Sequence, residues 1–546
     1  MSAELVLPAV GAADLCLRYG KRLLDIYEKF QGADKDVRAK VLIVESTWNR
    51  MAVQVEFVQR VAGTMNSDHC RVHFEVLEML QTKLLLTIKR LDPLIKEDDP
   101  YKPDKSKVRR WKYALLYESL DRTISELEQW QRIFDPTWYL IILMTDRAID
   151  HELLQQRQQS DDLSLATRHR QASWSSSSML TTTQKLRSTI QNSSNTDVHV
   201  KLPLDGLNWG TVRLIPHSTT QLICRTGSDK LFLMESISCN SDLDIPRARA
   251  DAESLARKLK LVDPNTFGLL SCQGLVKRKM QPTGTLSSID LIFRLPSEKS
   301  RPASLRHELL RHPIVSMTTI LGVARQLATA VSFVHTCDFV HKNIRPETIL
   351  LLAQPELNST AERATLGSLH LLGFDRFRSV NFHTARKGDA AWERNLYRHP
   401  LRQGLLAQEG YIMQHDIYSL GVCLLELGLW ESFVIYDEDY EGQGEGQGLN
   451  KMPSPTLGLS IEDFNFSGDP SSPSARIKDH LVDLAKSKLP QRIGDKYTAV
   501  VVTCLTCLDR GNEDFGDEED MRDDDGILIG VRFIEKILFR LSEISF

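Results

Sequence analysis

The sequence of 546 residues has no long apolar run, no strong excess of charge of either sign and no regular spacing of its cysteines. No uninterrupted apolar run reaches the roughly 20 residues that a helix needs to cross a bilayer. The net charge of −4 argues against nucleic acid as the main partner. The nine cysteines are odd in number and scattered, which indicates a reducing compartment such as the cytoplasm.

What the chain does contain is typical of a soluble globular protein with several domains. Apolar residues make up 42% and charged residues 26% of the sequence. On a prior of roughly 150 residues per domain, this length favours two to four domains. The local patterns predict a helical bundle over residues 1–150, a flexible linker with some helix at either end over 151–200, a strand-rich lobe over 201–296 and a mainly helical lobe over 297–546.

The first 150 residues predict helices, because apolar residues recur at steps of three and four. The start L-V-L-P-A-V-G-A-A at residues 5–13 and the segment 111–136 resemble the fungal HeLo domain of the prion-inhibition and propagation type. The resemblance implies a membrane-active module of programmed cell death and heterokaryon incompatibility, released through its first helix. The alternative is a bundle that only dimerises or docks.

The first helix has one apolar face of mostly small side chains, followed by Arg18, Lys21 and Arg22. Such a face beside a basic cluster suits anionic headgroups, so this is a candidate membrane helix. The same face could equally serve as bundle core. The residues of the face are Leu5, Val6, Ala9, Val10, Ala13 and Leu17.

The lobes after the Ser- and Gln-rich linker carry the clearest motif. Residues 341–350 read H-K-N-I-R-P-E-T-I-L and resemble the protein-kinase catalytic loop H-R-D-L-K-P-E-N-I-L, keeping His341 and a basic Arg345. The resemblance places Asn343 at the position of the catalytic Asp and Thr348 at that of a metal-binding Asn. A neutral amide has no basic site near pH 7, so Asn343 is not expected to be a general base.

Other positions of the kinase pattern are also changed. Gly373-Phe374-Asp375 stands where kinases have D-F-G, and Glu235 stands at the position of the strand lysine that binds phosphates. Glu235 could pair with an arginine of the helix that follows it. There is no G-x-G-x-x-G loop. Asp416, in a helix that matches the D-x-x-S-x-G pattern, is implied to hydrogen-bond the catalytic-loop backbone, which is a structural role.

The sequence therefore predicts a multidomain protein, with an all-α bundle followed by an α+β bilobal kinase-like domain. The expected function is that of a pseudokinase, not an enzyme, which controls an N-terminal effector and needs no cofactor. The expected partners are proteins, such as an upstream receptor or a second copy, and an anionic membrane, with no nucleic acid. The expected location is the cytoplasm, with a peripheral plasma-membrane position on activation. The alternatives are a scaffold that never meets lipid and an atypical protein kinase.

Overall fold

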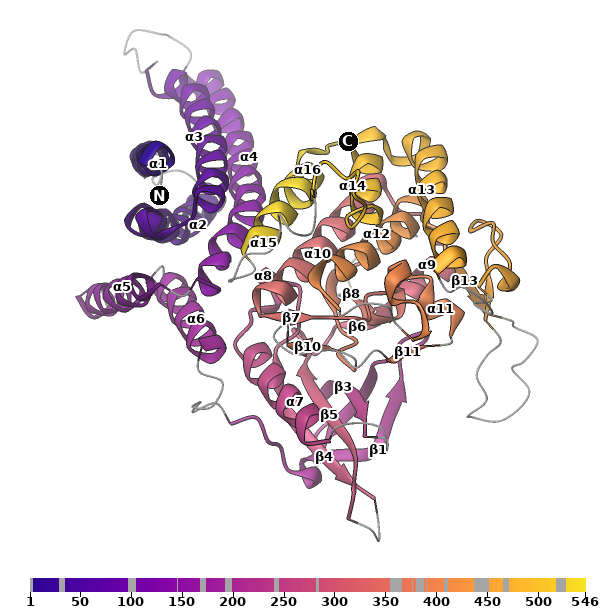
Figure 1. Ribbon diagram of the computed structural model, residues 1–546. Helices are drawn as coiled ribbons and strands as arrows, with labels where there is room; N and C mark the ends of the chain where they lie inside the picture. The colour runs from indigo at the N-terminus through magenta and orange to yellow at the C-terminus, as the bar shows by residue number, and fades with distance from the viewer. Residues whose placement is uncertain are drawn as a thin grey trace. The chain divides into compact units, whose positions relative to one another are not determined.

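The chain divides into two compact units in the computed structural model: residues 1–188 with 523–531, and residues 189–522 with 532–546 (Figure 1). The first is helical and the second mixes helices with antiparallel sheets, so the protein is multidomain. The structure describes residues 3–28, 35–96, 105–144, 146–166, 173–191, 199–239, 245–280, 284–353, 366–375, 377–379, 387–389, 391–406, 411–436, 451–464, 471–516 and 527–546.

The helical unit is built on long amphipathic helices: α1 (Ala3–Glu28), α2 (Lys35–Val61), α3 (Ser67–Lys96) and α4 (Lys105–Tyr139). Helix α1 packs on α2 and α3, and α4 packs on the same two helices; Figure 1 shows α3 and α4 side by side. Gly20 lets α1 approach α2 closely, since a Cβ there would lie 1.7 Å from Trp48 Cζ2. A 3-10 turn, Ala62–Thr64, separates α2 from α3, and another, Leu140–Ile142, follows α4.

The linker expected over residues 151–200 is instead helical over most of its length. Helices α5 (Arg147–Ala166) and α6 (Ser173–Gln191) cover it, while residues 167–172 and 192–198 lie outside the described residues. Leu153 and Leu186 supply buried apolar side chains that the Ser- and Gln-rich composition concealed. Arg187 is 1% exposed and donates to the Ile141 carbonyl at 2.9 Å. Arg187 therefore ties α6 to the 3-10 turn that follows α4.

The α+β unit begins with a five-stranded antiparallel sheet in the order β1-β2-β3-β5-β4. Helix α7 (Ile245–Lys260) follows β3 in sequence and packs on β4 and β5 (Figure 1). The strands are β1 (Leu207–Leu214), β2 (Gln221–Arg225), β3 (Leu231–Ser238), β4 (Cys272–Lys279) and β5 (Leu286–Arg294), with the short helix α8 (Pro264–Phe267) before β4.

A second sheet, in the order β6-β8-β9, and a group of helices complete this unit. Its strands are β6 (Arg301–Ser304), β8 (Ile349–Ala353) and β9 (Ser368–Leu371), and the shorter strands form pairs: β7 (Phe339–Val340) with β10 (Arg378–Ser379), β11 (Lys387–Asp389) with β12 (Gly404–Leu406), and β13 (Val434–Tyr436) with β14 (Lys451–Pro453). The helices are α9 (Leu305–Arg311), α10 (Met317–Thr336), α11 (Trp392–Asn395), α12 (Met413–Leu429), α13 (Ser471–Ile493) and α14 (Asp495–Leu505). After these come α15 (Ile527–Phe533), whose residues up to Val531 belong to the helical unit, and then the π-helical segment Ile534–Phe539 and α16 (Arg540–Glu543) of the α+β unit.

Two of these helices form the centre of the unit. Every residue of α12 is buried. Helix α10 is the one described helix that is long and apolar enough to cross a membrane by length and composition, a candidate that the search for uninterrupted apolar runs missed. Most of that apolar stretch, 61%, is buried inside the unit, which is how a core helix of a soluble domain passes the same test.

Candidate functional site

The segment that resembles the catalytic loop lies between β7 and β8 and is held by one carboxylate. Asp416 of α12, fully buried, accepts hydrogen bonds from the backbone N–H of His341 at 2.7 Å and of Lys342 at 2.9 Å. The Tyr411 hydroxyl donates to the same carboxylate at 2.7 Å. Burial alone would raise the pKa of Asp416, but His335 and the other donors lower it below its usual value. The carboxylate is therefore ionised and fixes the start of the loop.

Asn343 is held at both ends of its amide. Its Nδ2 donates to Asp375 Oδ1 at 2.7 Å, and its Oδ1 accepts from Arg345 Nε at 2.9 Å. Because an amide offers one acceptor oxygen and two N–H donors, these contacts fix its orientation. Asp375 is thus brought onto the loop, although it lies two residues after the position that the kinase pattern assigns to an acid.

The changed positions 348 and 373 lie against one another. Gly373 has φ +89, and a Cβ there would lie 2.3 Å from Thr348 Cγ2. The Thr348 hydroxyl lies 2.8 Å from the Asn343 carbonyl and 2.9 Å from the Arg345 carbonyl. Glycine has no side-chain ligand atom, and this hydroxyl already contacts backbone groups. These residues do not reproduce the magnesium ligands that the kinase resemblance implies.

Glu235 of β3 reaches across to the turn that follows β9. Its carboxylate accepts hydrogen bonds from the backbone N–H of Gly373 and, at 3.1 Å, of Phe374. The Thr220 hydroxyl donates to it at 3.0 Å. Glu235 is 3% exposed, and burial raises its pKa to about 7 despite these donors. We call this set of contacts the Glu235 clasp.

The sequence offers an arginine of the next helix as a partner for Glu235, and the structure shows another arrangement. Arg249 and Arg257 of α7 pair with Glu253 at 3.1 and 3.6 Å. The Glu235 side chain instead accepts hydrogen bonds from backbone N–H groups of the turn after β9. Thr220 carries no sequence pattern that would have marked it.

A buried ion network supports the other end of the loop. Arg306 of α9 is fully buried and pairs with Glu347 at 3.1 Å and Glu426 at 2.7 Å. Burial would raise the pKa of Glu347, but Arg306 and Arg345 lower it to about 2. The Tyr397 hydroxyl also bridges Arg306 and Glu426. Sequence reasoning missed Arg306, since nothing near it in the chain marks it as a partner of the loop.

The kinase-like positions therefore form one cluster. Hydrogen bonds connect Asn343 to Thr348, Gly373 and Asp375, and Glu235 accepts hydrogen bonds from the turn that contains Gly373 and Phe374. The His341 ring packs 4.9 Å from that of Phe374, and burial lowers the pKa of His341.

The candidate membrane residues lie in the other unit, on α1. Ala9 and Ala13 are buried in the bundle, while Val6, Val10 and Leu17 are partly exposed. The side chain of Leu5 lies outside the described residues. Arg18 pairs with Asp14, and Arg22 pairs with Asp92 at 3.3 Å. The face predicted to meet lipid therefore contributes to the core of the helical unit.

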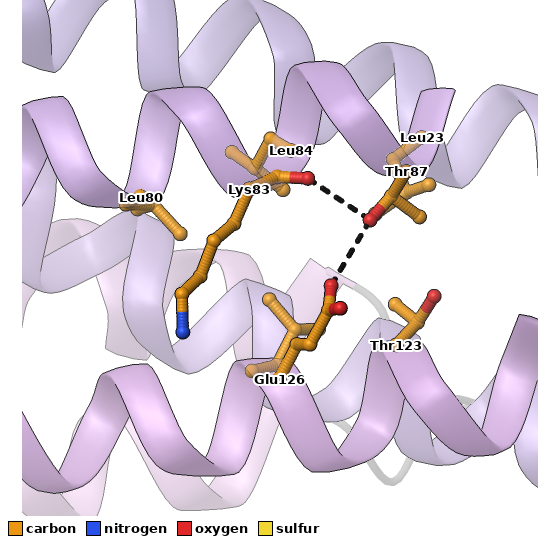
Figure 2. Close-up of a pocket in the computed structure, with 8 residues that line it drawn as sticks. Leu23, Leu80, Lys83, Leu84, Thr87, Thr123 and Glu126 are labelled. Carbon is orange, nitrogen blue, oxygen red and sulfur yellow. Dashed lines mark hydrogen bonds between the residues drawn. The ribbon is translucent and has the colours of Figure 1, made fainter. Parts of the chain in front are cut away.

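A small pocket lies among α1, α3 and α4 in the helical unit (Figure 2). Leucines, Thr87, Thr123, Lys83 and Glu126 line it, and Thr87 donates to Glu126 at 3.3 Å. Burial lowers the pKa of Lys83, whose ammonium lies 3.4 Å from Gln129 Oε1. No group of three His, Cys, Asp or Glu side chains that could hold a metal ion occurs among the described residues.

Comparison with known proteins links the chain to protein kinases over a limited length. No family model matches it. Over 155 residues it is 26% identical to the dual specificity protein kinase KNS1 of Saccharomyces cerevisiae, covering 25% of this chain and 20% of the yeast protein. Over 165 residues it is 26% identical to a probable serine/threonine-protein kinase of Dictyostelium discoideum, covering 30% of this chain and 9% of that protein. The chain thus spans a fifth or less of the length of these relatives.

These matches correct one prediction and leave another without support. Both relatives are named as protein kinases, so the prediction that the chain is not an enzyme is contradicted, and kinase activity is what the similarity suggests. The resemblance to the HeLo domain finds no support in the comparisons. What they do support is that the chain is a kinase-like protein.

Proposed function

We propose that the chain is a kinase-like signalling protein whose α+β unit controls its helical unit, an effector that binds anionic membrane surfaces in fungal cell death or incompatibility. The observation that carries the proposal is the Glu235 clasp. It ties the first sheet of the α+β unit to the turn after β9 through backbone N–H groups. A contact of this kind can be closed or open, and such a two-state element is what a regulatory domain needs.

The membrane step requires α1 to leave the bundle. Ala9 and Ala13 are buried, so lipid reaches them only after the helix detaches. Leu7 is 72% exposed and shares the outer face with Arg18 and Lys21, which are also exposed. Ion pairs at exposed sites contribute little, so the pairing of Arg18 with Asp14 leaves its charge available to a headgroup. First contact would be made by this outer face, and insertion would follow.

Vesicle flotation with the full-length protein tests this function. Vesicles that contain phosphatidylserine should carry more of the Glu235→Ala protein than of the wild type, because opening the clasp releases the effector. Leu7→Asp should reduce the bound fraction, whereas Leu42→Asp, an exposed leucine of α2, should not. If no variant binds anionic vesicles under any condition, the helical unit is a protein-docking scaffold and the membrane step is wrong.

Phosphotransfer by an unusual set of residues is a second candidate function. The observation that favours it is the Asn343–Asp375 hydrogen bond, which brings a carboxylate onto the loop. In this candidate the terminal phosphoryl group of ATP passes to a substrate hydroxyl, the hydroxyl proton goes to Asp375, and ADP leaves. Transfer of labelled phosphate to a generic protein substrate should then be lost in Asp375→Asn. It should survive in Asp229→Asn, an exposed aspartate of the same unit. Equal transfer by both variants would exclude Asp375 from this role.

A further inference from the structure

Two histidines of α3 contact one another in the interior of the helical unit. His69 and His73 are one helical turn apart, so their side chains lie on the same face of α3. Neither side chain has any exposed surface. Their Nε2 atoms are 3.1 Å apart and their ring centroids 4.7 Å apart. The Nε2 of His69 also lies 3.2 Å from the Thr137 carbonyl oxygen of α4.

The geometry requires the Nε2 of His73 to carry no hydrogen. A hydrogen bond between two ring nitrogens needs one N–H donor and one bare acceptor. Since the Thr137 carbonyl can only accept, His69 carries the hydrogen on Nε2 and His73 accepts. A proton added to His73 Nε2 would set two N–H groups against one another. It would also place a charge where it has no water to solvate it.

On the side of α4 the pair meets aromatic rings, and the Thr137 carbonyl raises the pKa of His69 by less than burial lowers it. The Phe134 ring of α4 packs 5.8 Å from that of His73 and stacks on Trp130. Burial lowers the pKa of His69 to about 4, and burial together with His69 lowers that of His73 well below its usual value. No carboxylate of the described residues raises either pKa.

The titratable groups on the neighbouring elements are engaged elsewhere. Asp135 of α4 accepts from Gln54 at 2.8 Å and from Arg50 at 3.2 Å, both on α2. The Cys16 thiol of α1 donates to the Leu77 carbonyl, and the Cys70 thiol to that of Ala62. With no third His, Cys, Asp or Glu in a metal-binding group among the described residues, a metal ion would meet only two rings and a carbonyl.

We propose that His69 and His73 form an acid-sensitive latch between α3 and α4, which loosens the helical unit as the pH falls below neutrality. Because both groups have a lowered pKa in the folded state, the open state binds more protons below pH 6.5. The stabilisation that the neutral histidine pair gives to the closed helical unit is complete above about pH 6.5 and is lost as the pH falls toward 4. The proposal stands independently of the function proposed above, since it concerns only contacts within the helical unit.

Hydrogen exchange followed by mass spectrometry on the full-length protein tests the latch locally. A local readout is needed because burial also lowers the pKa of His370 to about 4 and of His399 to about 3 in the α+β unit. Protection factors, referred to unfolded peptides at the same pH, should fall for peptides of α3 and α4 by roughly a hundredfold between pH 7.5 and 5.5. The hundredfold fall is the product of a roughly tenfold effect from each of the two histidines, which take up a proton only in the open state.

Substitution at one member of the pair separates the latch from general acid sensitivity. His73→Phe keeps a ring of similar size and leaves His69 its contact with Thr137, so the fall should shrink to roughly tenfold. His151→Gln, which changes an exposed histidine of α5, should keep the full wild-type fall. An undiminished fall in His73→Phe would overturn the proposal.

A second measurement needs no variant and remains decisive if His73→Phe does not fold. Slow deuterium exchange at the ring carbon between the two nitrogens reports the pKa of each histidine in the wild-type protein. His69 and His73 should titrate well below pH 6.5, the usual value for a histidine. If either of them titrates at or above pH 6.5 in the folded protein, the pair is not a latch.

Discussion

Thr348 and Gly373 are packed so closely that any side chain at residue 373 would overlap Thr348. A Cβ on residue 373 would lie 2.3 Å from Thr348 Cγ2 and 2.5 Å from its Cβ. Both residues stand where the kinase pattern has metal-binding side chains. The absence of a side chain at Gly373 leaves the space that the Thr348 methyl group occupies. A side chain added at residue 373 therefore requires Thr348 to move or to become smaller.

This packing predicts strong coupling between the two positions. Gly373→Ala should destabilise the α+β unit by roughly 2–4 kcal/mol, since it adds overpacking to the strain of a positive φ. Gly227→Ala has a similar φ of +72 with nothing within 4 Å, so it should cost only the backbone strain, roughly 1–2 kcal/mol. Adding Thr348→Ser to Gly373→Ala removes the overlapping methyl group, so this double variant should recover part of the lost stability. Urea unfolding of the wild type, the two glycine variants and the double variant measures these free energies. Equal losses in Gly373→Ala and Gly227→Ala would refute the packing argument.

The clasp predicts a pH dependence of the α+β unit. Burial raises the pKa of Glu235 to about 7 in the folded state from an ordinary value of 4.5. A raised pKa gives stabilisation that is complete below pH 4.5 and is lost as the pH rises through 7, a total of roughly 3 kcal/mol. Glu235→Gln cannot titrate, so the free energy of unfolding of the wild type minus that of the variant should fall across this window. A difference that is flat with pH would show that Glu235 does not titrate there.

The buried arginine predicts a large loss on truncation. Arg306→Met should cost roughly 3–5 kcal/mol, because it leaves Glu347 and Glu426 buried without their cation. Arg311→Met is the matched control, since the Arg311 side chain is 63% exposed and lies 3.7 Å from Glu308. It should change the unfolding free energy by less than about 0.5 kcal/mol. Similar losses in both variants would mean that the ion network does not support the loop.

The helix crossing in the helical unit predicts opposite effects of two glycine substitutions on α1. Gly20→Ala should loosen α1, since its Cβ would overlap the Trp48 ring at 1.7 Å. Gly11→Ala meets nothing within 4 Å and should stabilise the helix by roughly 0.5–1 kcal/mol, the usual gain of alanine over glycine. Hydrogen exchange of α1 peptides distinguishes the two. If Gly20→Ala leaves their protection unchanged, α1 does not pack as described.

Local patterns predicted much of this fold but not its long-range contacts. The helical period identified α1 to α4, and the motif at 341–350 located a loop that Asp416 holds by its backbone. The backbone donors of Glu235 and the carboxylate partners of Arg306 were not predictable, because they lie up to 139 and up to 120 residues away in the chain. The extent of the helices α5 and α6 was underestimated, because polar composition obscured the few buried leucines that they contain. The prediction that the chain is not an enzyme rested only on the positions that differ from the kinase pattern, and the similarity to two named protein kinases contradicts it.

Hydrogen exchange of α1 in the full-length protein tests the proposal that the state of the α+β unit governs the helical unit. Glu235→Ala removes the carboxylate that joins β3 to the turn after β9, without altering any residue of the helical unit. Glu298→Ala, an exposed residue of the α+β unit, is the control. If the unit governs the helices in this way, α1 peptides should be less protected in Glu235→Ala than in the wild type or in Glu298→Ala. Equal protection of α1 in all three proteins, with the clasp shown to be open by faster exchange at Gly373 and Phe374, would contradict it.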